Sequence, residues 1–267
     1  MKGSFFMKLL CAVCLAALFA ALFCSPHILP EETDPPASAA AIAEFGAADD
    51  SEKLFVIQND PIYPARLVRF AEDYPQAIDY VYHYPARKDT FDETPLFAEA
   101  ASDAPPLLFQ WDARWGYASY GDGLIGYTGC GPTVLSMAAL ALVGDPAYTP
   151  LFVARLADEN GYYVPNVGSS WALISTGCEL LGLSAREVPL SQDAMRQALD
   201  DGDLLAAVVG PGDFTKSGHF LLIRDFSDDG FILNDPNSAE NSALLWPFDV
   251  LMPQIKNIWA LSAGKKN

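Results

Sequence analysis

The chain has 267 residues, with 16 Lys and Arg against 34 Asp and Glu, which gives a formal charge of −18. This excess of acids repels phosphate backbones and anionic lipid, so nucleic-acid binding is not expected. About half of the residues are apolar (51%) and 19% are charged, which excludes a wholly disordered chain and predicts a core of ordinary size. The length accommodates one domain with appendages, or two small domains.

An uninterrupted apolar run from Leu9 to Phe23 follows Lys2 and Lys8 at the N-terminus. A basic start followed by an apolar stretch is typical of an export signal. The run is shorter than the roughly twenty residues of a membrane-spanning helix, although Phe5–Met7 lengthen it across Lys8. Two alternatives are therefore open for residues 1–24, a cleaved signal or an uncleaved anchor. Both predict an exported protein, either secreted or held at the outer face of the cytoplasmic membrane.

Three segments follow this run. Residues 25–52 are rich in Ala, Pro, Ser and acids without apolar periodicity, which predicts a linker. Residues 53–104 are expected to form a small helical extension, because Pro64 and Pro75 stand at first-turn positions and apolar residues recur at helical spacing. Its tyrosines could cover a cleft, but packing against the main domain is the favoured interpretation. Residues 105–267 form the main domain.

The main domain begins with helices and ends with strands. The segment Pro132–Leu142 is apolar on nearly every face and is followed by Gly144, which predicts a helix that is buried all round. Further helices are expected over 150–160, 171–182 and 192–200. Strands are expected over 204–209, 219–226, 231–234 and 258–262, with a hairpin turn at 227–230. This order predicts an α+β fold in which the early buried helix packs on a later antiparallel sheet.

Cysteine usage separates the N-terminal segment from the main domain. Cys11, Cys14 and Cys24 belong to the former, so Cys130 and Cys178 remain. Two thiols in an exported protein suggest one disulfide, whereas two unpaired thiols indicate chemistry. Cys178 lies in a predicted helix among leucines, which favours a buried, inert thiol. A disulfide between Cys178 and Cys130 would abolish any enzymatic role of Cys130 in that redox state.

The residues best suited to chemistry are Cys130, His219 and Asp235. Cys130 directly precedes the buried helix, where free backbone N–H groups and the helix dipole favour the thiolate. His219 opens one strand and Asp235 closes the next, so the hairpin brings both to the same end of the sheet. The register leaves them about three residues out of step, so a longer reach or a bulge must close the gap. An imidazole that takes the thiol proton, held by a carboxylate, makes a nucleophilic site.

Each of these three residues also has a plain structural explanation. Cys130 could be half of a disulfide, His219 a satisfied histidine at a strand end, and Asp235 the first residue of a turn. Taken jointly these explanations weaken, because the other two of the three histidines lie outside the main domain.

Six residues are candidates for substrate binding. Three are glycines that flank the thiol or precede the imidazole and would let a substrate backbone approach closely. The other three are aromatic residues of a Gly-rich stretch, which either line subsites or pack in the core or at the rim. The candidates are Gly129, Gly131, Gly218, Tyr162, Tyr163 and Trp171.

Two competing kinds of site are disfavoured. Gly121–Gly126 matches the dinucleotide pattern G-x-G-x-x-G, but no apolar strand precedes it and it leads into a loop. With one histidine in the main domain and neither paired cysteines nor an H-E-x-x-H motif, a catalytic zinc is also disfavoured. We therefore expect no cofactor and no metal.

Four motifs occur in a fixed order along the main domain. They are Gln-x-Asp-x-x-Trp from Gln110, Gly-Cys-Gly-Pro-Thr around Cys130, Gly-His-Phe around His219 and Asn-Asp-Pro around Asp235. Together they resemble exported relatives of the bacteriocin-processing (double-glycine type) papain-like cysteine peptidases, from Leu107 to the C-terminus. The resemblance implies a papain-like fold with Cys130 as nucleophile, His219 as general base and acid, and Asp235 as the residue that orients the imidazole.

The chain departs from this family at the oxyanion hole. Family members commonly place a glutamine a few residues before the nucleophile, whereas Leu124 stands six residues before Cys130. The nearest upstream glutamine is Gln110, twenty residues away. Gln110 reaches the site if the Gly/Tyr segment loops outward, helped by the backbone N–H of Cys130, and is otherwise a polar residue at a strand start.

The sequence therefore predicts an exported papain-like thiol hydrolase that cleaves a peptide or amide bond through an acyl-enzyme on Cys130. Its expected partner is a peptide or protein substrate, and only an uncleaved N-terminal segment would contact a membrane. One alternative is an amidase or acyltransferase on the same triad, such as a wall-peptide hydrolase. Another is a non-catalytic binding module, which the displaced glutamine favours and the retention of all three triad residue types disfavours.

Overall fold

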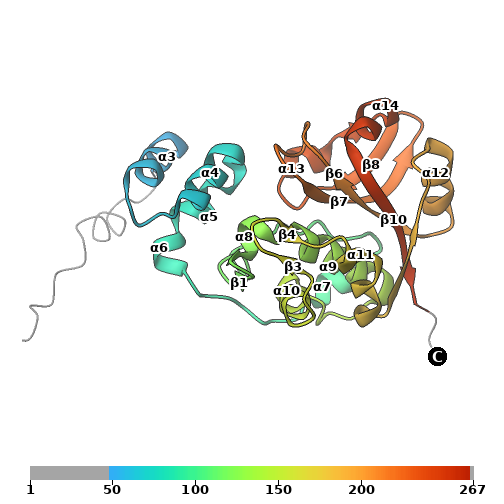
Figure 1. Cartoon of the computed structure of the whole chain (residues 1–267), viewed down its shortest axis with the longest axis horizontal. Coiled ribbons are helices and arrows are strands. Elements are labelled where there is room, and N and C mark those ends of the chain that lie inside the picture. The colour runs from blue at the N-terminus through green and yellow to red at the C-terminus, as the bar shows by residue number, and fades with distance from the viewer. Residues whose placement is uncertain (1–47, 265–267) are drawn as a thin grey trace, which may run out of the picture. The chain divides into compact units, whose positions relative to one another are not determined.

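The computed structural model of the chain describes residues 48–264 (Figure 1). The segment 1–24 and nearly all of the linker expected over 25–52 lie outside the described residues. Among residues 48–264, no helix combines the length and apolar character needed to cross a membrane.

Short helices make up the segment before the main domain. They are α3 (Asp50–Asn59), α4 (Ala65–Asp73), η1 (Pro75–Ala77), α5 (Ile78–Tyr82) and α6 (Tyr84–Arg87). Helix α3 was not predicted, and its first turn falls in the expected linker. Asp49 caps it by accepting from the backbone N–H groups of Ser51 and Glu52, and Glu52 accepts in return from that of Asp49. This reciprocal capping box starts the helix, whereas Pro64 and Pro75 start α4 and η1 as expected.

A tyrosine contact joins this extension to the main domain. The hydroxyl of Tyr80 donates to the carbonyl oxygen of Gly116 at 2.8 Å, and that of Tyr117 donates to the carbonyl oxygen of Tyr80 at 2.9 Å. The rings of Tyr80 and Tyr117 stack with centroids 4.6 Å apart. Tyr80 lies so close to Gly126 that a Cβ there would come within 2.2 Å of its hydroxyl oxygen. Tyr80 thus packs against the main domain, as favoured from the sequence.

The first half of the main domain is mainly helical. Its elements are β1 (Ser119–Tyr120), β2 (Gly123–Leu124), α8 (Ile125–Thr128), α9 (Cys130–Val143), α10 (Pro150–Glu159), β3 (Tyr163–Val164), β4 (Gly168–Ser169), α11 (Ala172–Ser175) and η2 (Gly177–Leu181). Helix α7 (Phe97–Ala100) precedes them in the segment expected as the extension, and it contacts α9. Helix α9 ends at Gly144, whose φ of 77° is the left-handed conformation of a helix C-cap. Every residue from Gly131 to Leu140 is buried, which confirms the predicted all-round burial.

The single helix predicted over 171–182 is wrong, because α11 and η2 are separate. The chain leaves helical geometry at Thr176, whose φ is −134°. The hydroxyl of Thr176 donates to the carbonyl oxygen of Ala172 at 2.9 Å, and Gly177 follows. A β-branched residue that bonds back to its own helix, followed by glycine, weakens the helix at this point.

The second half carries a six-stranded sheet. Its strands are β5 (Leu183–Glu187), β6 (Leu204–Val209), β7 (His219–Ser227), β8 (Gly230–Asn234), β9 (Leu245–Trp246) and β10 (Ile255–Ala263). Their order is β5-β10-β6-β7-β8-β9, and every neighbouring pair is antiparallel. The remaining helices are α12 (Gln192–Asp200), α13 (Ala239–Ala243), α14 (Phe248–Leu251) and η3 (Met252–Gln254). The short strand β9 and the edge strand β5 were not predicted.

Helices cover both faces of the sheet. Alternate residues of β6 point to opposite faces, as the pleat requires. Leu204, Ala206 and Val208 belong to the same core cluster as α9, whereas the intervening residues of β6 pack with Met195 and Ala198 of α12. The α+β fold with an early buried helix packed on a later antiparallel sheet is therefore confirmed.

A bulge in the β7–β8 hairpin decides which way Asp235 faces. From Ser227 paired with Gly230, the register runs to Asp225 paired with Ile232, and would set Asp235 opposite Leu222. The register shifts at Arg224, and Leu222 then pairs with Asn234. Asp235 is thereby set opposite Leu221, two residues from His219 instead of three. Because side chains alternate between faces, the bulge puts both side chains on the same face.

We expect Gly126→Ala to destabilise the protein, because the new methyl group collides with the ring and hydroxyl of Tyr80. Overpacking of this kind costs about 1–3 kcal/mol of unfolding free energy. Urea unfolding followed by circular dichroism measures the loss. Phe55→Ala, on the exposed surface of α3, is the control and should change the free energy by less than about 0.5 kcal/mol. An unchanged midpoint for Gly126→Ala would show that Tyr80 does not pack on α8.

Candidate active site

Cys130 is the first residue of α9, where the backbone N–H groups of the first turn have no partner within the helix. Burial alone would raise the pKa of its thiol. Hydrogen bonding to His219, the charge of that imidazole, and the backbone N–H groups of Phe220 and Gly131 act in the opposite direction and prevail, so the pKa lies below its ordinary value. The position thus favours the thiolate, as the location before a buried helix predicts.

His219 is the first residue of β7 and is buried. Its Nε2 lies 2.8 Å from Oδ1 of Asp235, which leaves Nδ1 for the thiol. Burial lowers the pKa of the imidazole, but the adjoining carboxylate of Asp235 and its hydrogen bond raise it further, as does Cys130, so the net shift is upward from about 6.5. A lowered thiol pKa beside a raised imidazole pKa favours a thiolate and imidazolium pair.

Asp235 is fully buried, and hydrogen bonds from its neighbours hold it in place. Its Oδ1 accepts from the backbone N–H of Asn237 at 2.8 Å as well as from His219, and its Oδ2 accepts from Nδ2 of Asn241 at 2.8 Å. The backbone N–H of Asp235 donates to Oγ of Ser242 at 2.8 Å. These bonds fix the carboxylate in one orientation, so that it can orient the imidazole of His219.

The structure separates the two cysteines of the main domain. Both Cys130 and Cys178 are free, and Cys178 lies in the core with none of its surface exposed. Burial raises the pKa of the Cys178 thiol to about 11. Cys178 therefore fits the interpretation of an inert core thiol, and it does not form the disulfide that the cysteine count suggested.

Gln110 lies at the site despite its distance along the chain. The intervening residues fold into the β1–β2 hairpin and α8, and the backbone N–H of Gln110 donates to the carbonyl oxygen of Pro236 at 2.9 Å, beside Asp235. Its Nε2 donates to the carbonyl oxygen of Gly126 at 3.0 Å. The second N–H of this nitrogen has no partner among the described residues, and Gln110 lines the same cavity as Cys130.

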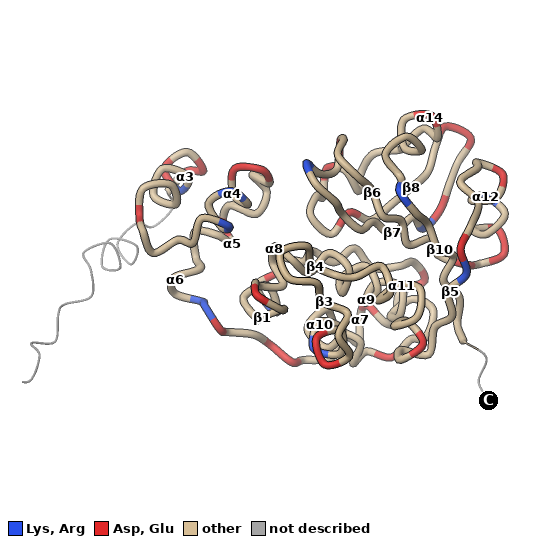
Figure 2. The backbone as a smooth tube through the Cα atoms, in the orientation of Figure 1, with Lys and Arg blue, Asp and Glu red and all other residues tan. Residues whose placement is uncertain are grey.

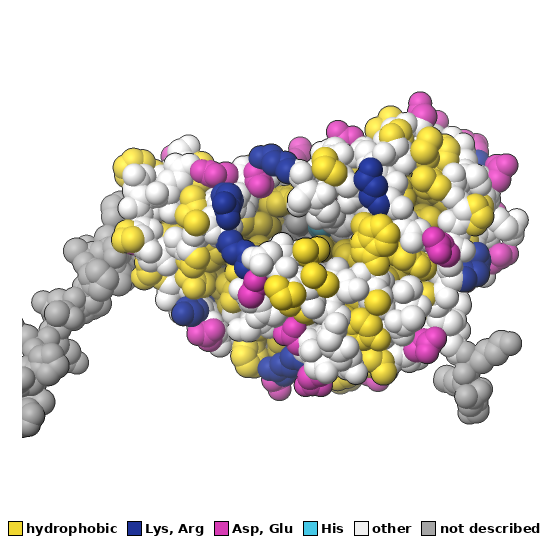
Figure 3. Space-filling view, in the orientation of Figure 1, with side chains coloured by type: hydrophobic (Ala, Val, Ile, Leu, Met, Phe, Trp, Pro, Cys, Tyr) yellow, Lys and Arg dark blue, Asp and Glu magenta, His cyan; other side chains and the backbone are white. Residues whose placement is uncertain are grey.

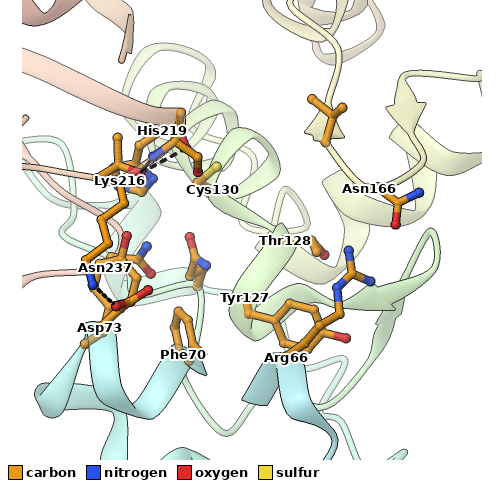
Figure 4. Close-up of a pocket in the computed structure, with 16 residues that line it drawn as sticks. Arg66, Phe70, Asp73, Tyr127, Thr128, Cys130, Asn166, Lys216, His219 and Asn237 are labelled. Atoms are coloured by element: carbon orange, nitrogen blue, oxygen red, sulfur yellow. Dashed lines mark hydrogen bonds and ion pairs between the residues drawn. The ribbon is translucent and has the colours of Figure 1, made fainter. Parts of the chain in front are cut away.

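A cavity of about 220 Å³ opens over the thiol. Cys130, His219 and Gln110 line it on one side, and Figure 4 shows Cys130 and His219 side by side there. Figure 3 shows a hollow on this face of the molecule with hydrophobic side chains around it. Of the six candidates for substrate binding, Gly218 belongs to the lining and the other five do not.

The glycines beside the thiol have a packing role. A Cβ at Gly129 would lie 2.5 Å from the carbonyl oxygen of Ile125, and one at Gly131 would lie 2.5 Å from Oγ of Ser169. Their absent side chains let α8 and β4 approach the start of α9. Contact of Gly129 and Gly131 with substrate stays a prediction.

The three aromatic candidates also lie outside the cavity lining. Tyr162 packs on Gly177 and the core cluster. The hydroxyl of Tyr163 donates to the carboxylate of Asp122, and its ring meets that of Tyr120 edge-on at 5.0 Å. Trp171 is 46% exposed and lies edge-on to Trp259 at 6.0 Å. Packing, which the sequence left open as an alternative, explains all three.

Comparison with known proteins shows to which family the chain belongs. A family model described as "Peptidase_C39 like family" matches residues 103–266, more than half of the chain. The chain belongs to the Peptidase C39-like family. Membership confirms the resemblance drawn from the motifs and the papain-like fold, and it implies a cysteine peptidase that acts on peptides or proteins.

Two solved structures are similar to this chain. The peptidase domain of Streptococcus ComA, described as a bifunctional ABC transporter involved in a quorum-sensing pathway, is 18% identical, with 52% of this chain and 93% of that chain covered and a TM-score of 0.37. A putative C39-like peptidase from Bacillus anthracis is 13% identical, with 66% of this chain and 100% of that chain covered and a TM-score of 0.39. No curated protein matches the chain.

Two residues near the thiol of this Peptidase C39-like chain were missed from the sequence. Asn237 and Tyr74 both line the cavity. Asn237 lies in the turn that Asp235 begins, and its place two residues after Asp235 was a usable signal. Tyr74 is one of the tyrosines of the extension that could cover a cleft, which the sequence left as the less favoured alternative.

We expect Cys130 to react with iodoacetamide below the ordinary thiol pKa, because its own pKa is lowered and the thiolate forms as the pH rises through it. His219→Ala removes the compensating hydrogen bond and charge but leaves the burial, so the midpoint should move upward. Labelling at pH 6 should then fall at least about tenfold, since one pKa unit changes the thiolate fraction tenfold. Mass spectrometry of the modified peptide measures the rate from pH 4 to 9. Cys178 is the internal control, and identical profiles with and without His219 would contradict the pairing.

Proposed function

We propose that the chain is an exported cysteine peptidase that uses Cys130, His219 and Asp235 as a catalytic triad. The observation that carries the proposal is geometric: the thiol, at the start of a buried helix, and the imidazole line one cavity, and the imidazole lies 2.8 Å from a buried carboxylate. This arrangement supplies a nucleophile, a group that can give and take a proton, and an anchor for that group.

Acylation begins when the thiolate of Cys130 attacks the carbonyl carbon of the scissile bond. The π bond breaks toward oxygen and leaves a tetrahedral intermediate with a negative charge. The free N–H of Gln110 Nε2 and the backbone N–H of Cys130 are the donors for this oxyanion. The imidazolium of His219 then protonates the leaving nitrogen, the C–N bond breaks, and the amine departs from a thioester on Cys130.

Deacylation uses the same groups in reverse. The neutral imidazole of His219 takes a proton from a water molecule as its oxygen attacks the thioester carbon. The second tetrahedral intermediate breaks its C–S bond, which releases the carboxylic acid and restores the thiolate and imidazolium pair. Asp235 stays hydrogen-bonded to Nε2 through both steps and stabilises the imidazolium form.

Export is the second part of this proposal. It is supported by the two lysines and the apolar run from Leu9 to Phe23 at the N-terminus. Cell fractionation with antibody against the full chain tests it, together with the N-terminal sequence of the mature protein. A cytoplasmic protein with an intact N-terminus would overturn this part and leave the triad unaffected.

We expect the full chain to hydrolyse members of a mixed peptide library, and Cys130→Ala to abolish this hydrolysis because no thioester can form. Mass spectrometry of the products, run in water enriched in ¹⁸O, measures it. One ¹⁸O in the new carboxyl group identifies hydrolysis of a backbone peptide bond. Transfer of the acyl group to an added amine, or release of ammonia from side chains, would instead identify an acyltransferase or an amidase.

We expect Asp235→Asn to retain more activity than Asp235→Ala. The amide oxygen of asparagine can still accept from Nε2–H of the imidazolium, whereas alanine leaves that buried N–H without a partner. The loss in kcat/KM should be about tenfold for asparagine and at least about 100-fold for alanine, the range of a general acid and base that is misplaced. Steady-state hydrolysis of a peptide selected from the library measures both, and equal losses would contradict an orienting role.

A further inference from the structure

The wall of the active-site cavity across from the thiol comes from the helical extension. Arg66, Phe70 and Asp73 of α4, together with Tyr74 at its end, line the cavity with Cys130 and His219. Figure 4 shows Phe70 and Asp73 on the helix that lies across the cavity from Cys130. Residues 103–266 match the family, so this wall lies outside the part of the chain that defines the family.

Ion pairs fix α4 to the main domain at both ends of the cavity. Asp73 pairs with Lys216, which stands in the loop before His219, and the pair is drawn in Figure 4. Nη1 of Arg66 lies 2.9 Å from Oδ1 of Asp122 at the other end. Just beyond α4, Oε1 of Gln76 accepts from the backbone N–H of Ala239 at 2.9 Å. These two ion pairs and this hydrogen bond therefore attach the α4 wall to the main domain.

The same ion pairs remove unpaired charge from the cavity. Acidic residues outnumber basic ones in the chain, and Figure 2 shows their positions along the loops and helix ends. In the cavity lining, however, Asp73 is balanced by Lys216 and Arg66 by Asp122. The remaining surface is aromatic on one side, where the ring of Phe70 lies 5.0 Å from that of Tyr74 and 6.4 Å from that of Tyr127. Such a surface suits an uncharged, apolar side chain.

The opposite rim carries one exposed apolar side chain, next to Asn166. Val167 lines the cavity from the turn between β3 and β4 and is 77% exposed, the largest exposure among the large hydrophobic residues of the described chain. A ligand that fills the cavity between this valine and the aromatic wall would remove the apolar surface of the valine from water. About 25 cal/mol of stabilisation accompanies each Å² of apolar surface removed from water.

Two buried acceptors indicate the polar part of the ligand. Oε1 of Gln110 and Oδ1 of Asn237 have no hydrogen-bond partner among the described residues, and the two residues are only 1% and 4% exposed. Both residues line the cavity. The Gln110 amide cannot be turned over, since its nitrogen must face the carbonyl oxygen of Gly126. Carbonyl oxygens only accept, so they suit a ligand that brings N–H groups, as an extended peptide backbone does.

Tyr74 connects the wall to these acceptors. It is half-buried and lines the cavity together with Thr215 and Asn237. Burial raises the pKa of the phenol, so it stays neutral at physiological pH. Tyr74 therefore contributes an uncharged aromatic side chain to the same cavity as Asn237.

We propose that Phe70 and Tyr74 of the extension determine specificity, and that they select peptides with an uncharged, apolar side chain at the residue whose carbonyl Cys130 attacks. Asn237 accepts an N–H of the same peptide. This inference rests on the proposed peptidase function, and it makes the extension part of the substrate site and not a tether.

The test uses the full chain and a series of acetyl-Ala-Xaa acyloxymethyl ketones, which alkylate a thiolate after binding like a substrate. Xaa is Leu, Lys or Glu, and the rate of modification at Cys130 is followed by mass spectrometry. We expect the Leu probe to react at least about tenfold faster than the Lys and Glu probes, a difference of about 1.4 kcal/mol in binding. Tyr74→Ala should lower the rate of the Leu probe about tenfold and that of iodoacetamide much less.

Two variants separate the roles within this result. Tyr74→Phe keeps the ring and should retain most of the preference for Leu. Phe55→Ala changes an exposed aromatic residue of the same extension, 67% exposed and away from the cavity lining, and should leave all rates unchanged. A loss in Phe55→Ala equal to that in Tyr74→Ala would show general disruption of the extension and would overturn the specific assignment.

Exchange of the ion pair tests the position of the wall. Asp73→Lys and Lys216→Asp should each lower the rate of the Leu probe about two- to fivefold, the effect of an exposed ion pair. The double variant should recover most of that loss. A faster reaction in either single variant would show that the extension obstructs the cleft, which overturns the inference.

Failure of this inference is distinct from failure of the proposed function. Labelling of Cys130 that depends on His219, but shows no preference for Leu or no effect of Tyr74→Ala, overturns the specificity assignment alone. Labelling that is independent of His219 overturns the peptidase proposal and the inference with it.

Discussion

The packing of α9 on the sheet is the constraint on which the active site depends. Residues Gly131 to Leu140 are buried, and α9 lies against β7, whose first residue is His219. The thiol and the imidazole are therefore positioned by a helix and a strand that share a core, and not by flexible loops. Geometry that is set by close-packed elements is held to a fraction of an ångström, which proton transfer between a thiol and an imidazole requires.

Burial of the three ionisable groups has a cost that their mutual contacts offset. A thiolate, an imidazolium or a carboxylate alone in this core would be strongly destabilised. Here His219 bonds to Asp235 and lines the same cavity as Cys130, and two further N–H groups, from Asn237 and Asn241, bond to Asp235. The free energy that favours the charged pair thus comes from the arrangement of the groups, while the solvent contributes little.

Local patterns in the sequence were enough to predict the elements that carry the triad. The bounds of α12 and β6 agree with the structure, α9 starts two residues earlier than expected, and the ends of β7 and β8 bring His219 and Asp235 together as predicted. These features depend on hydrophobic spacing and on turn residues that are neighbours in the chain.

The features that were not predicted depend on contacts between distant residues. Only glycine fits at position 131, because the side chain of Ser169 packs against it. Tyr74 reaches the cavity because Tyr80 of the same extension packs on Gly126 and Gly116. Spacing within one segment contains no information on such encounters. The exception is α3, whose capping box of Asp49 and Glu52 was visible in the sequence.

The bulge at Arg224 makes the length of the β7–β8 hairpin as important as its composition. Substitutions along the outer part of this hairpin alter single side chains and leave the alternation of faces intact. Loss or gain of one residue between His219 and Asp235 would instead rotate the carboxylate to the opposite face of the sheet. Among natural variants of this protein, the hairpin should therefore tolerate sequence drift but keep a fixed number of residues between these two positions.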